Sequence, residues 1–432
     1  MKRQIALLLA LVMLLCGCTG REAPVETTSA PEVPTTVPVQ TVPPTETESV
    51  NMQIVELTAW VTAEDIWADP ETLDAMLAEF NAYYPNILVH VEHVSPDRLA
   101  EEKPNIILGN TGDLALWAAE GGMADLSRLW ENLDAYSNVQ TACGDENGYF
   151  AIPMCVVPCC MAINREKFEA AQAMSLINTA NHTWSTPNFL KAGENLYHSG
   201  LENALTLYCM DTEGDVYTRL LVENMYGGSY VNTINGTYTA DSSAMANGVR
   251  ALREGLGFKY LSEVSASMAL EQFLNGETAM TLNWSSALQL KHMENEDIFY
   301  MLYPAGGKTK TYADVYGLGV FVSEDVQKQA ASMTFAAYAA SSDAVVRATG
   351  QLPACQSGED AYVGTEQEEV MKDLMKLLGY MVEGEIPGKC WEGARQEWVD
   401  MLQEISRGTN VVYCTEVCQV ELEALLRSAE NE

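Results

Sequence analysis

Tryptophan and tyrosine side chains stand out in this sequence because many of them occur where strands or loops are expected to end. An aromatic face can cover the C–H face of a sugar ring while nearby polar groups bond the ring hydroxyls. Core packing is the alternative for each of them, since aromatic side chains in soluble domains are mostly buried. The aromatic residues at expected strand and loop ends are Trp60, Trp67, Trp184, Tyr217, Tyr226, Trp284, Tyr316 and Trp391.

Reaction machinery is sparse by comparison. The sequence has no His-Glu-x-x-His, Gly-x-Ser-x-Gly or Gly-x-Gly-x-x-Gly motif. Gly307-Lys308-Thr309 imitates the end of a phosphate-binding loop, but the first glycine of that motif would fall at Leu302. A carboxylate pair of the glycoside hydrolase kind stays open, because a sequence does not give the distance between two carboxyl groups. We therefore expect a binding protein and not an enzyme, with no catalytic residues and no cofactor.

Nine cysteines remain after the two near the amino terminus are set aside, and an odd number cannot be fully paired. Cys155 and Cys159 would share a face of a strand, and Cys414 and Cys418 would share a face of a helix. Either pair could form a disulfide or half of a metal site. Because there is no Cys-x-x-Cys pair and the five histidines lie elsewhere, we favour buried free thiols and expect no metal.

The amino terminus has the features of a secretion signal. Met1-Lys2-Arg3 is positively charged, and the apolar run from Ile5 to Leu15 is too short to span a bilayer. Leu15-Cys16-Gly17-Cys18 resembles a bacterial lipobox, in which cleavage after Gly17 leaves Cys18 as a lipidated amino terminus. We therefore predict a signal peptide over residues 1–17 and an extracytoplasmic protein, held to the outer face of the bacterial cytoplasmic membrane by a lipid on Cys18.

Composition separates a linker from the rest of the chain. Residues 19–50 consist mainly of Thr, Pro, Val, Glu and Ser without an apolar period, so such a segment cannot bury a core. Together with the lipidated Cys18, it forms a predicted linker over residues 18–50. The formal net charge of −36 and the lack of clustered Lys and Arg argue against a nucleic-acid partner.

The remaining chain alternates strands with helices. A strand over residues 54–61 precedes a helix that Asp69-Pro70 opens and Tyr84-Pro85 stops, and a second strand follows over residues 87–91. Strands separated by helices imply a mostly parallel sheet, and hence an α/β fold. An apolar segment over residues 149–163 is long enough to cross between two lobes, and residues 317–322 read as a later strand.

A helix, a strand and an aromatic residue follow one another between residues 264 and 284. Asn275-Gly276 should end the helix, because both residues tolerate the left-handed conformation. Residues 279–282 read as a short strand, after which Ser285 or Ser286 can cap the next helix. Trp284 would then lie outside the carboxyl end of a strand, where open α/β sheets bind ligands. A core tryptophan is the alternative.

Several stretches in order resemble the extracellular solute-binding proteins of bacterial ABC importers, in family 1, the branch that includes the maltose-binding protein. The resemblance covers nearly all of residues 53–428, and its order of pieces is more specific than any single piece. The stretches that carry it are Leu57–Trp60, Pro104–Leu126, Tyr149–Pro153 with Asn164-Arg165, Thr183-Trp184, Gly227-Gly228, Phe273–Trp284, and Pro304 with Gly317–Gly319.

The resemblance implies a two-lobed periplasmic-binding-protein-like α/β fold with discontinuous lobes, a hinge and a ligand cleft between the lobes. The N-terminal lobe would comprise residues 51–155 and 318–365, and the C-terminal lobe residues 156–317 and 366–432. A monomer would capture a small-molecule solute, a sugar or oligosaccharide, by hinge closure and deliver it to permease subunits in the membrane. The alternatives are a surface lipoprotein acting as a ligand sensor or adhesin without a permease, and a secreted glycoside hydrolase.

Matching positions within the family imply a set of residues that face the cleft. The maltose-binding branch has an acidic side chain that binds the sugar at the position where this chain has Val157. The loop of this chain at Gly109 also lacks the tryptophan of that branch. Maltose itself is therefore not the expected ligand. The implied ligand-binding residues are Trp60, Glu64, Asn110, Asp113, Asp215, Tyr217, Asn283, Trp284 and Trp391.

Overall fold

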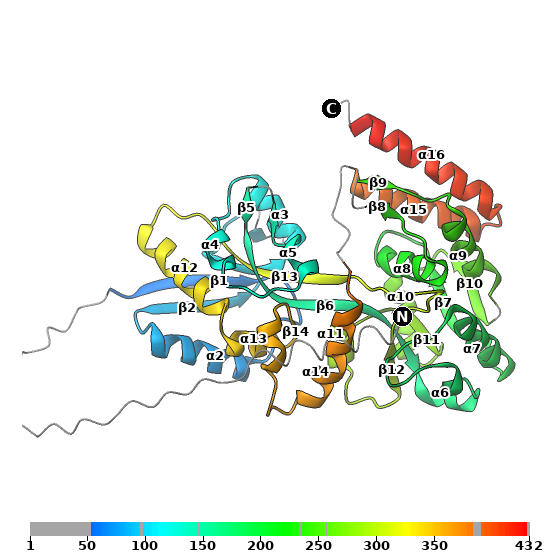
Figure 1. Cartoon of the computed structure of the whole chain (residues 1–432), viewed down its shortest axis with the longest axis horizontal. Helices are drawn as coiled ribbons and strands as arrows, with labels where there is room; N and C mark the ends of the chain where they lie inside the picture. Colours follow the sequence, from blue (N-terminus) through cyan, green and yellow to red (C-terminus); the bar gives the residue numbers. More distant parts are fainter. Residues whose placement is uncertain are drawn as a thin grey trace, which may run out of the picture. The chain divides into compact units, whose positions relative to one another are not determined.

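A computed structural model describes most of the chain beyond the linker. The described residues are 53–95, 98–99, 101–145, 147–232, 236–255, 257–382 and 390–429. The predicted signal peptide, Cys18 and the linker lie outside the described residues. Met52–Glu432 forms one compact unit (Figure 1). Within the described residues, no helix has both the length and the apolar character needed to cross a membrane.

The first part of this unit is the predicted β-α-β arrangement. Strand β1 (Val55–Val61) and strand β2 (Ile87–His93) are parallel neighbours, and helix α2 (Pro70–Tyr83) connects them. The side chain of Asp69 caps α2 by accepting a hydrogen bond from the backbone N–H of Thr72, which stabilises a helix start. The strand, the helix and the proline-assisted start were all predictable from the local pattern.

One long strand links the two ends of the main sheet. Strand β6 (Ala151–Asn164) is buried over all but its last residue. Strand β13 (Ala313–Val320) runs antiparallel beside it and also pairs with β3 (Ile106–Asn110). The strand order among the described residues is β10-β7-β11-β6-β13-β3-β1-β2, and β12 and β14 also pair with β6. The sequence therefore correctly predicted a long crossing strand, but it placed the start of β13 at residue 317.

The run between residues 264 and 286 folds as a helix, a strand and a second helix. Helix α10 (Ala266–Leu274) ends at Asn275, and Gly276 adopts a φ of +74°, which glycine allows without a steric cost. Strand β11 (Met280–Ser285) follows, and the Ser285 hydroxyl accepts a hydrogen bond from the backbone N–H of Leu288 at the start of helix α11 (Ser286–Lys291). The predicted helix stop and cap are both confirmed.

Shorter elements and the other helices complete the described part of the chain. The further strands are β4 (Gly144–Asp145), β5 (Gly148–Tyr149), β7 (Leu205–Tyr208), β8 (Val231–Asn232), β9 (Thr237–Tyr238), β10 (Phe258–Ser262), β12 (Ile298–Met301) and β14 (Leu352–Pro353). The further helices are α3 (Thr111–Ala119), α4 (Ser127–Trp130), α5 (Ser137–Gln140), α6 (Arg165–Ala170), α7 (Thr186–His198), α8 (Asp215–Tyr226), α9 (Ser243–Glu254), α12 (Val326–Ala339), α13 (Asp343–Thr349), α14 (Glu368–Leu374), α15 (Trp391–Ser406) and α16 (Val411–Ala429), with 3₁₀ turns at Met174–Leu176, Gln356–Asp360 and Met375–Tyr380.

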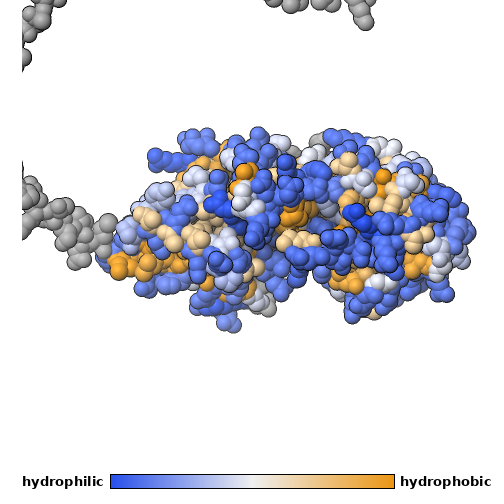
Figure 2. Space-filling model, turned by 90° about the horizontal axis from the view of Figure 1, so that it is seen from below, coloured by the Kyte–Doolittle hydropathy of each residue, from blue (hydrophilic) through white to orange (hydrophobic). Residues whose placement is uncertain are grey.

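Two hydrophobic cores lie at the two ends of the sheet. The first core gathers β1, β3 and the early part of β6 with α12, α13 and α14. The second core gathers the late part of β6 with β7, β11, α8, α15 and α16. Two cores joined by shared strands are the architecture of a two-lobed α/β protein. Figure 2 shows a largely hydrophilic face with separate apolar patches.

Candidate functional site

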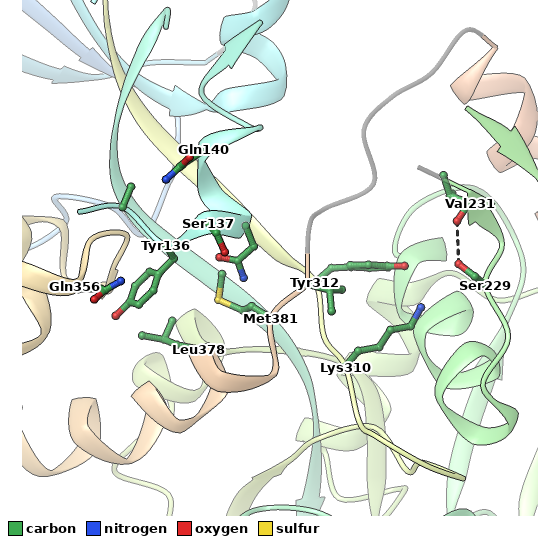
Figure 3. A pocket seen from close by; sticks show the side chains of 13 residues that line it. Tyr136, Ser137, Gln140, Ser229, Val231, Lys310, Tyr312, Gln356, Leu378 and Met381 are labelled. Atoms are coloured by element: carbon green, nitrogen blue, oxygen red, sulfur yellow. Dashed lines mark hydrogen bonds between the residues drawn. The ribbon is translucent and has the colours of Figure 1, made fainter. Parts of the chain in front are cut away.

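A cavity of about 790 Å³ opens where segments of the two cores meet. We call it the interlobe cavity because Tyr136 and Met381 belong to the first core, whereas Val231 and Tyr312 belong to the second. Its volume suits a small-molecule ligand. Figure 3 shows side chains reaching it from α5, from the approach to β13 and from the turn after α8. The lining residues are Ala135, Tyr136, Ser137, Asn138, Gln140, Ser229, Val231, Lys310, Tyr312, Gln356, Leu378, Met381 and Val382.

The segment that leads into β13 carries polar groups at alternate positions. Lys310 and Tyr312 line the interlobe cavity, and Asp314 and Tyr316 follow on β13. Alternate residues of an extended strand lie on one face. Asp314 pairs directly with Val157 of β6, so the two side chains also share a face. The polar groups of this segment therefore continue from the cavity along one side of the crossing strands.

The Asp314 side chain is accessible to solvent, although the surrounding protein reduces the hydration of its carboxyl group. Its side chain is exposed, yet burial of the carboxyl group raises its pKa above the ordinary value of 3.8. The side chain therefore keeps contact with solvent while the protein around it removes part of its hydration. This carboxylate makes no hydrogen bond or ion pair within the described chain. Perturbed groups in clefts are candidates for functional sites.

Tyr217 and Tyr316 lie within electrostatic reach of Asp314, and a second carboxyl group acts on Tyr316. Burial raises the pKa of half-buried Tyr217 on α8, and Cys159 and Asp314 add to the shift. Burial also raises the pKa of Tyr316, with Asp314 and Asp113 among the negative groups that contribute. The pKa of Asp113 is itself raised by burial. Because a phenol with a raised pKa keeps its proton, both tyrosine hydroxyls can donate hydrogen bonds.

Lys310 is already neutralised by an acidic partner. Its Nζ lies 2.7 Å from Oε2 of Glu223, whose side chain is fully buried on α8. The same carboxylate accepts hydrogen bonds from the Tyr312 hydroxyl and from the backbone N–H of Tyr230. Lys310 is also the only Lys or Arg among the residues that line the cavity. Within that lining, no positive charge is left unpaired for an anionic ligand.

Three of the nine sequence-predicted ligand residues, Asn110, Asp113 and Tyr217, lie near this face. The charge of Asp314 contributes to the raised pKa of Tyr217, and Asp113 contributes to the raised pKa of Tyr316. Asn110 pairs with Tyr316 across the β3–β13 ladder, and its side chain caps α3 by accepting a hydrogen bond from Gly112 N–H. Asn283 is half-buried on β11. Their binding roles remain predictions.

Two predicted residues are buried in the core, and a third lines another cavity. Trp60 is 2% exposed and lies beneath the Arg98 guanidinium at 4.3 Å. Glu64 lines a second cavity of about 470 Å³ at the ends of β1 and β2. Trp284 is fully buried, so its ring does not face a cleft in this structure. Its indole N–H donates to Gln289 Oε1, and the ring packs edge-on against Phe273.

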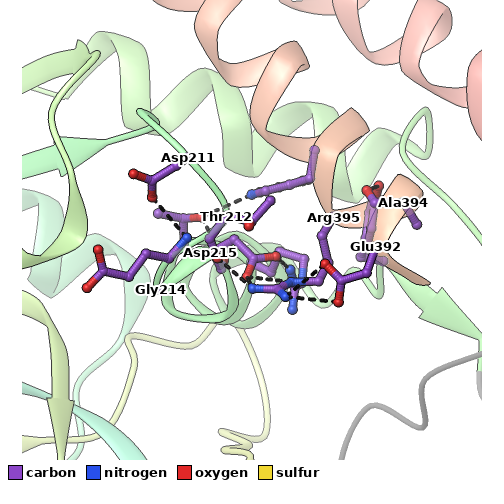
Figure 4. Close-up of polar contacts among 12 residues, drawn as sticks. Asp211, Thr212, Gly214, Asp215, Glu392, Ala394 and Arg395 are labelled. Carbon is purple, nitrogen blue, oxygen red and sulfur yellow. Dashed lines mark hydrogen bonds and ion pairs between the residues drawn. The ribbon is translucent and has the colours of Figure 1, made fainter. Parts of the chain in front are cut away.

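Asp215 belongs to a structural contact between α8 and α15 (Figure 4), and Trp391 is the first residue of α15. Asp215 is 4% exposed and forms ion pairs with Arg219 and Arg395. Arg395 also donates to the backbone oxygen of Thr212. The sequence expectation placed the Asp215 carboxylate in the cleft, whereas the structure uses it to fasten two helices. Trp391 is half-buried at the start of α15, with the Arg219 guanidinium 5.1 Å from its ring.

Asp314 and Lys310 were not among the residues predicted from the sequence, and Tyr316 was predicted as an aromatic residue at a strand or loop end but not as a ligand residue. A signal for them exists in the alternation of Lys310, Tyr312, Asp314 and Tyr316 with smaller residues, which is typical of a strand with one polar face. Because the strand was predicted to begin at residue 317, this alternation was not read as part of a strand. No group of three or more His, Cys, Asp or Glu side chains in the described chain could hold a metal ion.

Comparison with known proteins gives the same architecture. The chain matches the model of the bacterial extracellular solute-binding proteins over residues 75–360. Similar solved structures include a cyclic alpha-maltosyl-1,6-maltose binding protein from Arthrobacter globiformis, with 14% identity, a TM-score of 0.68 and coverage of 87% of this chain and 100% of that chain. An ABC substrate-binding protein from Listeria monocytogenes in complex with cycloalternan is 16% identical, with a TM-score of 0.65 and coverage of 87% of this chain and 99% of that chain.

A third similar structure has a different kind of ligand. UgpB from Mycobacterium tuberculosis, in complex with glycerophosphocholine, is 15% identical, with a TM-score of 0.65 and coverage of 87% of this chain and 99% of that chain. No curated protein matches the sequence. At these identities the solved structures establish the fold, and the match to the family model covers more than half of the chain. The chain therefore belongs to the bacterial extracellular solute-binding proteins.

Proposed function

We propose that this protein captures a sugar or oligosaccharide between its two lobes and delivers it to the permease of an ABC importer. The observation that carries the proposal is the set of polar groups on the crossing strands beside the interlobe cavity. Asp314, Tyr217 and Tyr316 offer a carboxylate and two hydroxyls that the described chain leaves available. Groups of this kind can bond sugar hydroxyls, and nearby aromatic faces can cover a sugar ring.

The similar structures support a carbohydrate ligand. The ligands of the similar proteins include cycloalternan and a cyclic maltosyl-maltose, and one of these proteins holds glycerophosphocholine. Family membership and the sequence resemblance support delivery to a permease. The signal peptide over residues 1–17, the lipid on Cys18, the linker over residues 18–50, the lobe boundaries and the monomeric state remain part of this proposal on sequence grounds.

Isothermal titration of the purified protein against a panel of neutral mono- and oligosaccharides tests the proposal. We expect saturable binding of at least one carbohydrate with one site per chain. The panel should also contain amino acids and short peptides as competitors of another chemical class. Silent titrations across all carbohydrates, alongside binding of an amino acid or peptide, would contradict the sugar assignment while leaving the family intact.

A glycoside hydrolase is the second candidate, because Asp113 and Asp314 both have a raised pKa and both influence Tyr316. Hydrolases use two carboxyl groups, one of them held protonated. Chromatography of the oligosaccharide recovered after prolonged incubation with the protein separates the two functions. A binding protein returns the oligosaccharide intact, and shortened products would show turnover.

A further inference from the structure

Asp314 is an acidic group of this site that makes no hydrogen bond or ion pair within the described chain. A carboxylate that loses hydration is costly unless a partner offsets the loss. Glu223, an acidic group beside the cavity, is buried but bonded to Lys310, Tyr312 and Tyr230. Asp314 lacks such a set of partners, and its side chain is exposed. Its oxygens are therefore open to hydrogen bonds from a ligand.

Asp314 lies on β13, beside the β6 position at which the family resemblance predicts the ligand-binding acidic residue. Val157 on β6 is apolar and 7% exposed, so it offers no hydrogen bond. Asp314 is its direct partner across the β6–β13 ladder, and directly opposed side chains have Cβ atoms about 5 Å apart. A carboxylate on β13 can therefore reach nearly the same volume that a longer acidic side chain on β6 would reach.

The charges around the cavity restrict the ligand. Lys310 is held by Glu223 at 2.7 Å, and no other Lys or Arg lines the cavity. Asp314 and Asp113 are both acidic. An anionic solute would meet uncompensated negative charge in surroundings where its own hydration is also reduced, and such contacts act against the wrong ligand. Hydroxyl groups, in contrast, can donate to Asp314 and exchange hydrogen bonds with Tyr217 and Tyr316.

We propose that Asp314 is the ligand-recognising carboxylate of this protein and that it selects an uncharged, polyhydroxylated solute over an anionic one. This inference rests on the proposed function, because it assigns a residue and a charge class to the same site. Val157 supplies an apolar contact beside the carboxylate. Tyr217 connects the second lobe to the same ligand, so that a solute bound at Asp314 touches both cores.

The test compares Asp314→Asn with Glu324→Gln, which removes the same charge at an exposed position beyond the end of β13. Each variant and the parent are titrated with the neutral carbohydrate that binds the parent most tightly, with its phosphorylated derivative and with its amino-sugar counterpart. We expect Asp314→Asn to weaken the affinity for the neutral carbohydrate at least tenfold. The ratio of the affinity for the neutral carbohydrate to that for its phosphorylated derivative should also become smaller. Glu324→Gln should bind within twofold of the parent. Thermal midpoints confirm that both variants are folded.

The outcomes separate this inference from the function on which it rests. If the parent binds a neutral carbohydrate and Asp314→Asn binds it equally well, the residue assignment is wrong and the proposed function stands. If the parent prefers the phosphorylated or the amino derivative, the charge class is wrong. A parent that binds no carbohydrate overturns both the proposed function and the inference.

Discussion

His182 lies between two hydrogen-bond acceptors, one of which is the carboxylate of Asp373. Its Nε2 is 3.1 Å from Asp373 Oδ2, and its Nδ1 is 3.0 Å from the backbone oxygen of Tyr300. A neutral imidazole carries one N–H and can satisfy one acceptor, whereas an imidazolium carries two and satisfies both. The ring is 3% exposed and stacks on the Tyr300 ring at 3.8 Å. The pair joins the loop before α7 to helix α14.

Asp373 should make the stability of the protein depend on pH in the acid range. Burial alone would raise its pKa, but hydrogen bonds and charges from His182 and Lys376 lower it from 3.8 to about 2. A lowered pKa stabilises the fold above the unfolded-state value and loses this contribution as pH falls through about 2. Because the side chain is 39% exposed, solvent screening reduces the contribution to about 1 kcal/mol.

Denaturant unfolding of Asp373→Asn at pH 6 and at pH 2 measures this contribution. The variant should be less stable than the parent at pH 6, and the difference should shrink at pH 2. Glu369→Gln, an exposed change on the same helix, should leave stability unchanged at pH 6. A difference that stays constant over the whole range would show that the carboxylate charge is not responsible.

Trp284→Ala should destabilise the fold. The ring is fully buried, packs against Phe273 and donates to Gln289, and truncation of a core aromatic costs about 3 to 5 kcal/mol. Urea unfolding monitored by circular dichroism gives the loss directly, and Trp284→Phe should lose less because it keeps part of the packing. Weaker ligand binding at unchanged stability would instead place the ring in the cleft, as the sequence suggested.

Arg395→Gln should loosen α15 from α8. The guanidinium Nε and Nη2 lie 3.1 and 3.0 Å from Asp215 Oδ1, and Nη2 also reaches the Thr212 backbone oxygen. Asp215 keeps Arg219 as a partner, so the expected loss is about 1 to 2 kcal/mol and not the full cost of an isolated buried charge. Arg250→Gln on α9 removes an equal charge outside this contact. Equal unfolding midpoints for the two variants would contradict the role of Arg395.

The cysteines should react in a defined order with a thiol reagent. All nine in the described residues are free thiols, and Cys355 and Cys390 are the two that are not buried. Burial raises the pKa of Cys355 to about 12, which lowers its thiolate fraction. We expect Cys390 to react first and the buried thiols to react after denaturation. Fewer than nine thiols released by denaturant without reductant would reveal a disulfide.

The local parts of the fold were predictable from the sequence because their signals are local. Asp69 caps α2, Gly276 ends α10 and Ser285 caps α11 through contacts within a few residues. The site was less predictable because it depends on pairing between distant strands. Whether Trp284 faces a cleft or a core depends on Phe273 and on the helix that follows, and its sequence position is the same in both cases.

The partners of charged groups were the least predictable feature. Asp215 and Glu223 lie on the same helix, and nothing in their spacing shows that Arg395 and Lys310 will reach them from far along the chain. Asp314 presents the converse case, since its lack of a partner is visible only once the surrounding strands are in place. The family resemblance predicted the fold and the region of the cleft, and geometry was needed to identify the groups still free to bind.

The two prolines of β6 have a mechanical consequence. Pro158 pairs with Ala313 and Pro153 pairs with Gly317, where the register also shifts. Proline has no N–H, so the ladder can twist at both positions without losing a hydrogen bond from that residue. The β6–β13 ladder therefore has fewer hydrogen-bond donors on either side of the Val157–Asp314 pair. A molecule held at that pair would lie between two weakened points of the ladder.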